Sequence, residues 1–371
     1  MKTIAIIGAG EAALPIINKA REMGVRSLAF GRLDSFAKDL VDIFIEENSF
    51  DIDFMKSECL KHNVNGIMAS SEMTTAVAAT LAHGLNLPGN SVEGGFAGKN
   101  KYEMRKRVST VSSIRQPKFE LYQDGKDYSF PIIVKSVDAC GKRGVSLVRD
   151  KAEFEVALNL AQDNSSDGSA LIEEYLCGGQ EYSIECLSSG SIHDVVQYTE
   201  KESSGPPHFV EIAHHQPAAL TDEMKSRIKQ AVSDVLDVLG LTCGMAHFEM
   251  KIIDNELYFI EVGARHGGDH IGDTLTLLST DCDYFRQAIL CALGEYQHQE
   301  VNCKGYAGIY FHCEQNKGLD NLFKKARNAD WCYADTVKKD EFDAASSNVE
   351  SANSGYIIYH SDHRITMNNE N

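Results

Sequence analysis

The stretch HFEMKIIDNELYFIEVGARHGG (residues 247–268) contains the features from which the fold and the function are inferred. Apolar residues alternate with polar ones on both sides of Asp254-Asn255, a pattern that predicts two strands joined by a tight turn. Glu249 and Glu261 stand at equal distances before and after Asn255. A hairpin centred on Asn255 therefore makes the two carboxylates cross-strand neighbours, whose Cβ atoms lie about 5 Å apart.

Two carboxylates this close repel each other, and a cation between them would remove the repulsion. Carboxylate oxygens suit Mg²⁺ when substrate phosphates complete its coordination. The alternative is a solvated sheet face on which Lys251 relieves part of the charge. In either case the opposite face of the hairpin is predicted to be apolar, with Phe248, Met250, Ile252, Ile260 and Val262.

The residues after this hairpin add a cation and a flexible loop. Arg265 follows Glu261 closely, and Gly267-Gly268 come next, which places a fixed positive charge beside the metal site and lets a ligand approach the backbone. A surface turn with a solvated arginine is the alternative.

A second group of cations lies upstream. Lys135 ends the apolar strand predicted over 130–134 and is costly to bury unless it meets an anion such as phosphate; otherwise its side chain reaches solvent. In the loop that follows, Gly141 and Gly144 bracket two cations, so backbone N–H groups can turn toward phosphates. The loop lacks the GxxxxGK[ST] pattern, and an ordinary hairpin turn is equally compatible with it.

The segment EEYL, which comprises Glu173, Glu174, Tyr175 and Leu176, precedes a Gly-Gly turn and Glu181. Such a linker can present its own N–H and C=O groups to an adenine ring, while Glu181 can accept hydrogen bonds from ribose hydroxyls. A short strand with exposed carboxylates is the alternative.

Composition and patterning describe a globular chain of 371 residues in two to three domains, with 43 % hydrophobic and 24 % charged residues. Strands alternate with helices up to about residue 98, which predicts a parallel sheet. The Gly- and Asn-rich run 85–101 is interpreted as the exit from this first domain. Further along, Thr221 is expected to cap a helix whose end is marked by Gly240.

Charge and cysteine usage exclude several classes of protein. A formal net charge of −18 argues against a nucleic-acid partner. No apolar run reaches the roughly 18 residues of a membrane-spanning helix, and the N-terminus is interpreted as a strand entering the fold, not a signal peptide. The ten cysteines are scattered without a Cys-x-x-Cys pair, which favours a reducing cytoplasm.

Taken in order, NKYEMR with Lys101, FPIIVKS with Lys135, DACGKRGVSLV, EEYLCGGQEYSIE, HFEMK and FIEVGARHGG resemble the ATP-grasp superfamily. The similarity spans roughly residues 1–298 and is closest to the carboxylate-amine ligase branch, which includes L-amino acid ligases. It implies an α/β (α+β) chain with an N-terminal parallel-sheet, Rossmann-like pre-ATP-grasp domain (1–98), an ATP-grasp domain (99–297) and a small mixed C-terminal domain (298–371). Within the ATP-grasp domain it implies a lid at about 108–175 and a larger catalytic subdomain at about 176–297.

The resemblance also implies roles for individual residues. ATP phosphates would contact Lys101, Lys135 and the loop of Gly141 and Gly144, adenine and ribose would contact Glu173, Glu174, Tyr175, Leu176 and Glu181, and Mg²⁺ or Mn²⁺ would bind Glu249 and Glu261. Arg265 would stabilise phosphate and acyl-phosphate oxygens, and the substrate would lie near Glu211, His214, Gly267 and Gly268. One departure matters: many members have Asn where this chain has Gly263, which puts the coordination of a second metal ion in question.

The reaction implied is attack of a small carboxylate on the γ-phosphate of ATP, followed by displacement of phosphate from the acyl phosphate by an amine. A lid that excludes water is expected, and the 138–145 loop and segment 200–208 are candidates. A side-chain nucleophile is not required, which agrees with the lack of a convincing Ser-His-Asp or Cys-His arrangement in the sequence. Members of the family often pair through the N-terminal or central domain, so a homodimer is expected.

Three alternatives stay open. A purine-pathway or carboxylase-type ATP-grasp enzyme would use formate or bicarbonate as the acid. Gly8-Ala9-Gly10-Glu11-Ala12-Ala13 fits the G-x-G-x-x-A fingerprint of NAD(P)-dependent oxidoreductases, although Phe30-Gly31-Arg32 offers no acidic residue for a ribose. A protein that keeps the fold for binding, without turnover, is the third.

Overall fold

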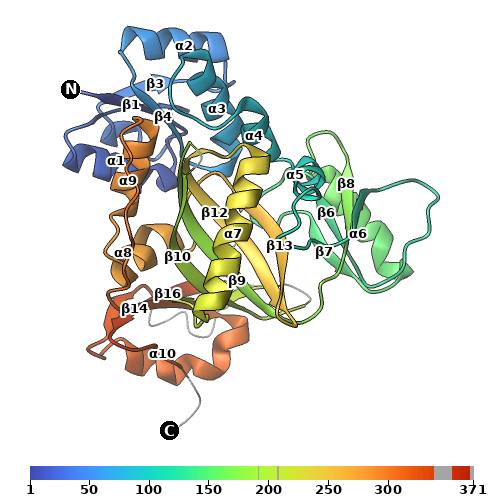
Figure 1. The fold of residues 1–371 in the computed structure, drawn as a ribbon. Helices are drawn as coiled ribbons and strands as arrows, with labels where there is room; N and C mark the ends of the chain where they lie inside the picture. Colours follow the sequence, from blue (N-terminus) through green and yellow to red (C-terminus); the bar gives the residue numbers. More distant parts are fainter. Residues whose placement is uncertain (191, 207–208, 338–352, 368–371) are drawn as a thin grey trace.

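The computed structural model describes residues 1–190, 192–206, 209–337 and 353–367. The chain begins with a parallel sheet of four strands in the order β3-β2-β1-β4, as the alternating pattern predicts. Helices pack around this sheet in the upper part of Figure 1. Its elements are β1 (Thr3–Ile7), η1 (Glu11–Ala13), α1 (Leu14–Glu22), β2 (Arg26–Gly31), η2 (Lys38–Leu40), β3 (Ile43–Glu46), α2 (Ile52–Lys61), β4 (Gly66–Ala69), η3 (Glu72–Thr74) and α3 (Thr75–Gly84).

The run 85–101, which is interpreted as the exit from the first domain, contains the short helix α4 (Val92–Ala97). Its glycines allow close packing. A Cβ atom at Gly95 would lie 2.7 Å from the Cβ of Ala79 on α3, and one at Gly94 would lie 2.6 Å from the carbonyl oxygen of Gly240. The glycines of this run therefore allow α4 to pack closely against its neighbours.

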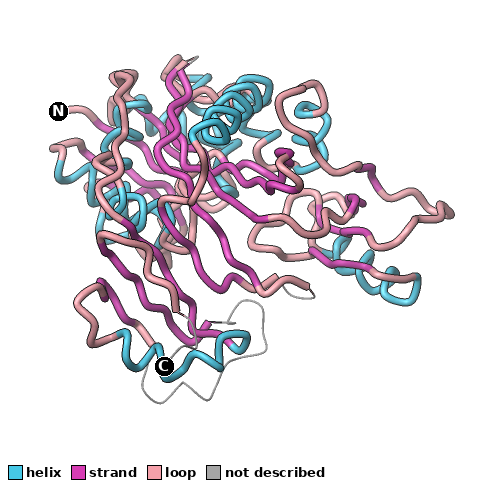
Figure 2. Tube along the Cα trace, turned by 60° about the horizontal axis from the view of Figure 1, so that its bottom comes forward, coloured by secondary structure: helices cyan, strands magenta, loops and turns pink. Residues whose placement is uncertain are grey.

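A second sheet lies within the predicted lid and projects to one side of the molecule in Figures 1 and 2. Its four antiparallel strands have the order β5-β8-β6-β7, and α6 packs on β6, β7 and β8. Helix α5 precedes it and begins where the Asn100 side chain accepts a hydrogen bond from the N–H of Glu103. The bounds are α5 (Lys101–Val108), β5 (Phe119–Leu121), β6 (Ile132–Ser136), β7 (Val145–Val148), α6 (Lys151–Asp163) and β8 (Ala170–Glu174).

The central sheet has eight strands in the order β13-β12-β9-β10-β11-β14-β16-β15, all paired antiparallel. Strands β14 and β16 come from the C-terminal segment, and β14 pairs with β11, so this segment extends the central sheet. The strands are β9 (Gln180–Ser189), β10 (Ile192–Ser203), β11 (Glu211–Gln216), β12 (Cys243–Ile253), β13 (Glu256–Gly263), β14 (Tyr306–Cys313), β15 (Cys332–Asp335) and β16 (Asn353–Ser361).

Helix α7 (Asp222–Leu239) covers one face of this sheet in Figure 1 and leaves the other for the site. The Thr221 side chain accepts a hydrogen bond from the N–H of Met224, and Gly240 ends the helix in the left-handed conformation, so both predicted ends are confirmed. The apolar face of α7 is also buried, since Ile228, Val232, Val235, Leu236 and Leu239 pack in one core with Phe248 and Phe259 of the hairpin.

The remaining helices lie after the hairpin. They are the π-helix η4 (Ile271–Leu275), α8 (Thr276–Ser279), α9 (Tyr284–Ala292), the 3₁₀-helix η5 (Glu314–Leu319) and α10 (Asp320–Ala326). Helix α9 packs against α1, β4, β9 and β12, and so joins the parallel sheet to the central one. None of the helices in the described part of the chain is both long and apolar enough to span a bilayer.

We predict that Gly240→Ala destabilises the protein more than Gly168→Ala. Both glycines have φ near +74° (74° and 73°), where an added side chain costs roughly 1–2 kcal/mol, but only at Gly240 does the new Cβ overlap the Ser91 hydroxyl that caps α4. The overlap should add about 1–3 kcal/mol. Urea unfolding of the two variants measures the difference, and equal losses would contradict the packing argument.

Candidate active site

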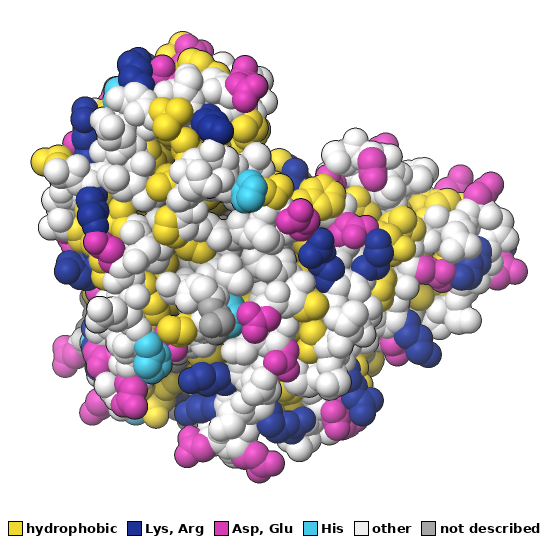
Figure 3. Space-filling model, turned by 45° about the horizontal axis from the view of Figure 1, so that its top comes forward, with side chains coloured by type: hydrophobic (Ala, Val, Ile, Leu, Met, Phe, Trp, Pro, Cys, Tyr) yellow, Lys and Arg dark blue, Asp and Glu magenta, His cyan; other side chains and the backbone are white. Residues whose placement is uncertain are grey.

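A cavity of about 450 Å³ lies between the lid sheet and the central sheet, beside α5. Figure 3 shows a notch between the N-terminal body and the lid, with acidic and basic side chains interspersed around it. Twelve of the residues predicted for the site line the cavity: Lys101, Lys135, Gly141, Gly144, Glu173, Glu174, Tyr175, Leu176, Glu181, Glu211, Glu249 and Glu261. The lining also includes Arg105, Ile133, Lys142, Lys201, Phe209, Lys251 and Ile260.

The predicted pairing of Glu249 with Glu261 is confirmed, because the two residues are directly opposite in the ladder between β12 and β13. The register shifts immediately afterwards, so Met250 pairs with Phe259 and Ile260 is the extra residue of a bulge. The prediction that Ile260 faces the apolar side is therefore wrong. Ile260 lines the cavity, and the fully buried Phe259 takes its place in the core.

Glu249 is held by two cationic side chains. Lys201 Nζ lies 2.6 Å from Glu249 Oε1, and His247 Nε2 lies 3.2 Å from the same oxygen. Burial alone would raise the pKa of Glu249, but Lys201 and His247 outweigh it and lower that pKa well below its usual value. The alternative that Lys251 relieves this charge is wrong, since Lys251 Nζ lies near Glu181 and donates to the carbonyl oxygen of Leu176.

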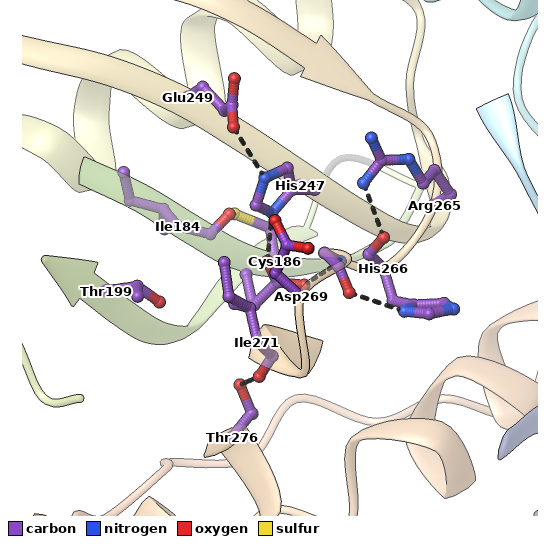
Figure 4. A network of polar contacts seen from close by, with 12 residues as sticks. Ile184, Cys186, Thr199, His247, Glu249, Arg265, His266, Asp269, Ile271 and Thr276 are labelled. Atoms are coloured by element: carbon purple, nitrogen blue, oxygen red, sulfur yellow. Dashed lines mark hydrogen bonds and ion pairs between the residues drawn. The ribbon is translucent and has the colours of Figure 1, made fainter. Parts of the chain in front are cut away.

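Behind Glu249, His247 lies between two carboxylates, and Figure 4 shows its contact with Glu249. Its Nδ1 contacts Glu185, whose side chain is fully buried and also accepts hydrogen bonds from the N–H of Gly267 at 2.9 Å and the hydroxyl of Tyr284 at 3.1 Å. Burial lowers the pKa of His247, but the two carboxylates outweigh it and raise that pKa to about 9. His247 is thus a cation at neutral pH and helps to fix the orientation of Glu249.

Glu261 faces the lysine at the start of α5. Lys101 Nζ lies 3.9 Å from Glu261 Oε2 and donates a hydrogen bond of 2.6 Å to the carbonyl oxygen of Ala139 in the glycine loop. The paired carboxylates therefore have a lysine on each side, Lys101 beside Glu261 and Lys201 beside Glu249.

Lys135 on β6 contacts the buried carboxylate of Glu173 on β8, the adjacent strand in the sheet. Its Nζ lies 2.8 Å from Glu173 Oε2, while Arg105 Nε lies 2.7 Å from Glu173 Oε1. Burial opposes ionisation of Glu173, but Arg105 and Lys135 outweigh it and lower its pKa to about 2; burial lowers the pKa of Lys135. The position of the Lys135 ammonium group in the cavity is thus set by Glu173.

The loop between β6 and β7 is both a hairpin connection and a wall of the cavity, from Ala139 to Val145. Gly141 and Gly144 have φ of 66° and 70°, which only glycine adopts without strain. Lys142 Nζ lies 2.7 Å from Glu211 Oε1 and 2.6 Å from the carbonyl oxygen of Phe209, so this loop touches the residues just after the other expected lid segment, 200–208. Pro207 and His208 of that segment lie outside the described residues.

The EEYL segment divides into two parts. Glu173 and Glu174 belong to β8, and the Glu174 N–H bonds the carbonyl oxygen of Lys118, so these backbone groups are already paired. Tyr175 and Leu176 follow the strand at the cavity wall, near Lys251 and Glu181. Only these two residues of the predicted hinge have backbone groups outside the ladder of β8.

Four of the predicted residues lie away from the cavity lining. Arg265 Nη2 lies 3.3 Å from Glu72 Oε2 in the N-terminal domain. Burial lowers the pKa of Arg265, but the carboxylates of Glu72, Glu249 and Glu261 outweigh burial and raise that pKa. His214 is fully buried, and neither of its ring nitrogens has a hydrogen-bond partner in the described part of the chain. The other two, Gly267 and Gly268, lie in the loop that follows β13.

That loop is closely packed and locally strained. A Cβ atom at Gly267 would lie 2.6 Å from Glu185 Oε1, so only glycine fits there. The next residues, Asp269 and His270, have φ of 52° and 62°, and the π-helix η4 begins at Ile271. Strained backbone and π-turns concentrate at functional sites, and Asp269 Oδ2 lies 3.9 Å from Nε2 of the buried His214.

The donor set of the hairpin fits a Mg²⁺ ion. Glu249 and Glu261 provide hard oxygen ligands at cross-strand distance, and phosphates in the same cavity would supply others. Within the described ranges, no group of three or more His, Cys, Asp or Glu side chains is arranged to hold a metal by itself. Two protein carboxylates plus phosphate and water oxygens match this ion, which retains waters in most protein sites.

Several functional candidates were missed from the sequence. Arg105, Lys201, Glu72 and Glu185 lie on elements far from the hairpin in the chain, and their pairing depends on tertiary contacts. His247 offered a signal, since it stands two positions before Glu249 on the same strand and therefore on the same face.

A Ser-His-Asp series does occur elsewhere. Ser188 Oγ lies 2.8 Å from His193 Nδ1, and His193 Nε2 lies 3.0 Å from Asp237 Oδ1. Ser188 is only 1 % exposed, so its hydroxyl has no access to a substrate. The series ties the β9–β10 hairpin to α7.

Comparison with known proteins agrees with this architecture. Residues 128–273 match the family described as ATP-grasp domain. A biotin carboxylase from Allochromatium vinosum is 22 % identical over 341 residues, which cover 83 % of this chain and 74 % of that protein.

Two solved structures share the fold over nearly the whole chain. The L-amino acid ligase from Bacillus licheniformis has a TM-score of 0.78 at 23 % identity, and covers 98 % of this chain and 94 % of its own. The N5-carboxyaminoimidazole synthetase from Staphylococcus aureus, complexed with ADP, has a TM-score of 0.76 at 17 % identity with the same coverage of 98 % and 94 %. The chain therefore has the ATP-grasp fold and contains an ATP-grasp domain.

We predict that Glu173→Gln lowers the free energy of unfolding at neutral pH by about 3–5 kcal/mol, because it leaves Arg105 and Lys135 buried without their carboxylate. Glu103→Gln, which removes only the exposed partner of Lys106 on α5, should cost less than about 1 kcal/mol. Denaturant unfolding measures both.

The pH dependence gives a second readout. Because the pKa of Glu173 falls from 4.5 to about 2 on folding, its carboxylate contributes stability that is present above pH 4.5 and lost as the pH falls toward 2. The wild type should lose more stability than Glu173→Gln between about pH 6 and about pH 3. Parallel losses would show that Glu173 is not ion-paired in the folded state.

Proposed function

We propose that the protein is an ATP-dependent carboxylate-amine ligase. In this proposal ATP phosphorylates the carboxylate of an amino acid or another small acid, and an amine then displaces phosphate to form an amide or peptide bond. ADP and phosphate are released.

The observation that carries the proposal is the meeting of opposite charges around one cavity. Glu249 and Glu261 are paired on β12 and β13 at the cavity, Lys101 lies beside Glu261, and Lys135 lines the cavity from β6. Phosphoryl transfer depends on positioning and charge neutralisation more than on covalent help from the protein. This arrangement supplies both, with no nucleophilic side chain required.

Each part of the cavity then has a role. Tyr175 and Leu176 offer backbone groups to adenine, and Glu181 accepts from the ribose. Lys101 and Lys135 bind phosphates, Glu249 and Glu261 hold Mg²⁺ or Mn²⁺, and a bound Mg²⁺ would neutralise phosphate charge. The ADP in the structure of the related S. aureus synthetase supports nucleotide binding in this fold.

The acid and amine would bind beyond the phosphates, where the strained loop after β13 meets the central sheet. Arg265 stabilises the negative charge of the acyl phosphate, and Glu211 and Gly268 lie beside the substrates. His214 and Gly267 are buried and act on the substrates only through their neighbours. The glycine loop, held to Glu211 through Lys142, excludes water from the acyl phosphate, which hydrolyses readily. The fold shared with an L-amino acid ligase supports amino acids as substrates.

A second candidate is favoured by the similarity to biotin carboxylase, which covers 83 % of this chain. In that case the acid would be bicarbonate, or formate in the related purine-pathway reaction. By contrast, Gly8 of the N-terminal fingerprint needs no nicotinamide nucleotide to explain it, because a Cβ atom there would lie 2.5 Å from Ser70 Oγ.

We also propose a cytoplasmic location and a homodimeric assembly. All ten cysteines are free thiols, as is usual for proteins of a reducing compartment. Size-exclusion chromatography with light scattering tests the dimer.

We predict Mg²⁺-dependent release of ADP and phosphate when the protein is supplied with a suitable acid and amine. The assay uses amino acids singly and in pairs, with formate and bicarbonate in parallel. Glu261→Gln should lower the rate by roughly a hundredfold or more, because it removes a metal ligand.

The matched control is Glu256→Gln on the same strand, which removes only a surface partner of Arg115 and should leave the rate unchanged. Release that requires two amino acids identifies a ligase of the peptide-forming type. Release with bicarbonate or formate alone supports the second candidate, and tight ATP binding without release under any condition would contradict both.

A further inference from the structure

His214 on β11 is a fully buried histidine whose two ring nitrogens have no hydrogen-bond partner in the described part of the chain. A polar group buried without a partner is costly. The ring packs edge-on against Phe311, with 5.4 Å between the ring centroids. Its Nε2 lies 3.9 Å from Asp269 Oδ2, which is too long for an ordinary hydrogen bond. His214 is therefore beside Asp269, and neither side chain fully satisfies the other.

A bulge in β11 brings a second unpaired polar atom to the same face of the sheet. In the ladder with β10, His214 is opposite Lys201. Glu211 is opposite Ser203, only two positions further along β10, so Glu211 and His214 share a face although they are three positions apart. Glu211 Oε1 contacts Lys142 and Lys201, but Oε2 of this carboxylate is buried without a partner among the described residues.

Asp269 approaches this face from the loop after β13. Asp269 and the next residue, His270, adopt left-handed conformations that cost energy in residues other than glycine. The π-helix η4 holds the end of this loop, because the N–H of Leu275 bonds the carbonyl oxygen of His270 at 2.9 Å. Within η4 and α8, Thr276 Oγ1 donates to the carbonyl oxygen of Ile271 at 2.8 Å (Figure 4). The Asp269 side chain is 55 % exposed, so a ligand can touch it.

The polar group formed by Asp269, Glu211 and His214 has an excess of acceptors. The imidazole of His214 lowers the pKa of Asp269. Burial would raise the pKa of Glu211, but Lys201 outweighs it and lowers that pKa, so both residues are carboxylates at neutral pH. Lysines neutralise Glu211, whereas within the described ranges only His214 is close enough to Asp269 to form an ion pair. A ligand at this place has to supply N–H donors and positive charge, and a protonated amine supplies both.

We propose that Asp269 is a specificity-determining residue that binds a protonated amino group of the substrate, with Glu211 Oε2 as a second acceptor and His214 as a positioning residue behind Asp269. The inference rests on the proposed ligase function and names the chemistry of its substrate. The group held here is not the attacking amine, because an ammonium nitrogen has no free electron pair. It is an ammonium group of the acid that is activated, either on its α-carbon or at the end of its side chain.

The test measures binding by calorimetry on the full chain with Mg²⁺ and ADP, using two matched pairs of acids. L-Lysine and L-norleucine differ in a side-chain ammonium group, and L-alanine and propionate differ in the α-ammonium group. The wild type should prefer the ammonium-bearing member of at least one pair roughly tenfold or more, because the other member leaves the Asp269 carboxylate without its charged donor. Asp269→Asn should remove that preference and leave the affinity for the other member unchanged.

The variants are chosen to keep the fold. Asparagine tolerates the left-handed conformation at position 269, and Asp269→Gly, which also suits it, replaces Asp269→Asn if the latter does not fold. Asp273→Asn removes the same charge from η4 and should keep the preference. His214→Phe removes the imidazole behind Asp269, and should weaken binding of the ammonium-bearing member alone, whereas a merely structural role would weaken both members alike.

The two pairs distinguish the sources of the ammonium group. A preference that Asp269→Asn removes only between lysine and norleucine assigns the side-chain group, and one removed only between alanine and propionate assigns the α-ammonium group. A wild type that shows no preference in either pair would overturn the proposal. The same holds if Asp269→Asn keeps the preference, or if it weakens both members of a pair equally.

The binding measurement does not depend on turnover. If the wild type releases no ADP with any acid, yet Asp269→Asn loses the preference for the ammonium-bearing member, the site stands and the ligase function fails. If the wild type ligates and the variant keeps the preference, the function stands and the site fails.

Discussion

The structure depends on the cross-strand pairing of Glu249 with Glu261, two like charges that β-sheet geometry places about 5 Å apart. Such a pair is unfavourable in isolation, and the surrounding elements offset it. Lys101 approaches from the start of α5, Lys201 from β10, and His247 from the preceding position on the same face of β12. The fold thus brings cations from separate parts of the chain to one pair of carboxylates.

These contacts extend into a chain of alternating charges. Glu185 contacts His247, His247 and Lys201 contact Glu249, and Glu211 contacts Lys201 and then Lys142 of the glycine loop. Most of these side chains are buried, where charge interactions are strong and an unpaired group is costly. A change at Glu249 is therefore felt at Glu211, the carboxylate that pairs with Lys142 of the glycine loop.

The sequence predicted those parts of the fold and the site that are local along the chain. The ends of α7 followed from Thr221 and Gly240, because caps are set by a few neighbouring residues. The pairing of Glu249 with Glu261 was predicted from a hairpin centred on Asn255, but the turn is centred between Asp254 and Asn255, and the bulge at Ile260 restores that pairing. Lys201 and Arg105 could not be placed, since their partners lie 48 and 68 positions away. The bulge that turns Ile260 toward the cavity could not be predicted either, because the alternation of apolar and polar residues along the strand does not reveal it.

Gly263, the departure from the common pattern, has a structural consequence at the same hairpin. A Cβ atom there would contact the Cγ and Nε atoms of Arg265 at 3.4 Å, so a longer side chain would compete with the guanidinium group for space. With glycine, Arg265 lies back along the strand and reaches Glu72 of the N-terminal domain. The chain gives up an amide oxygen near the metal site and gains an ion pair between domains. Under the proposed function, coordination of a metal would rely on two carboxylates and on phosphate oxygens, which would make metal and nucleotide binding depend on each other.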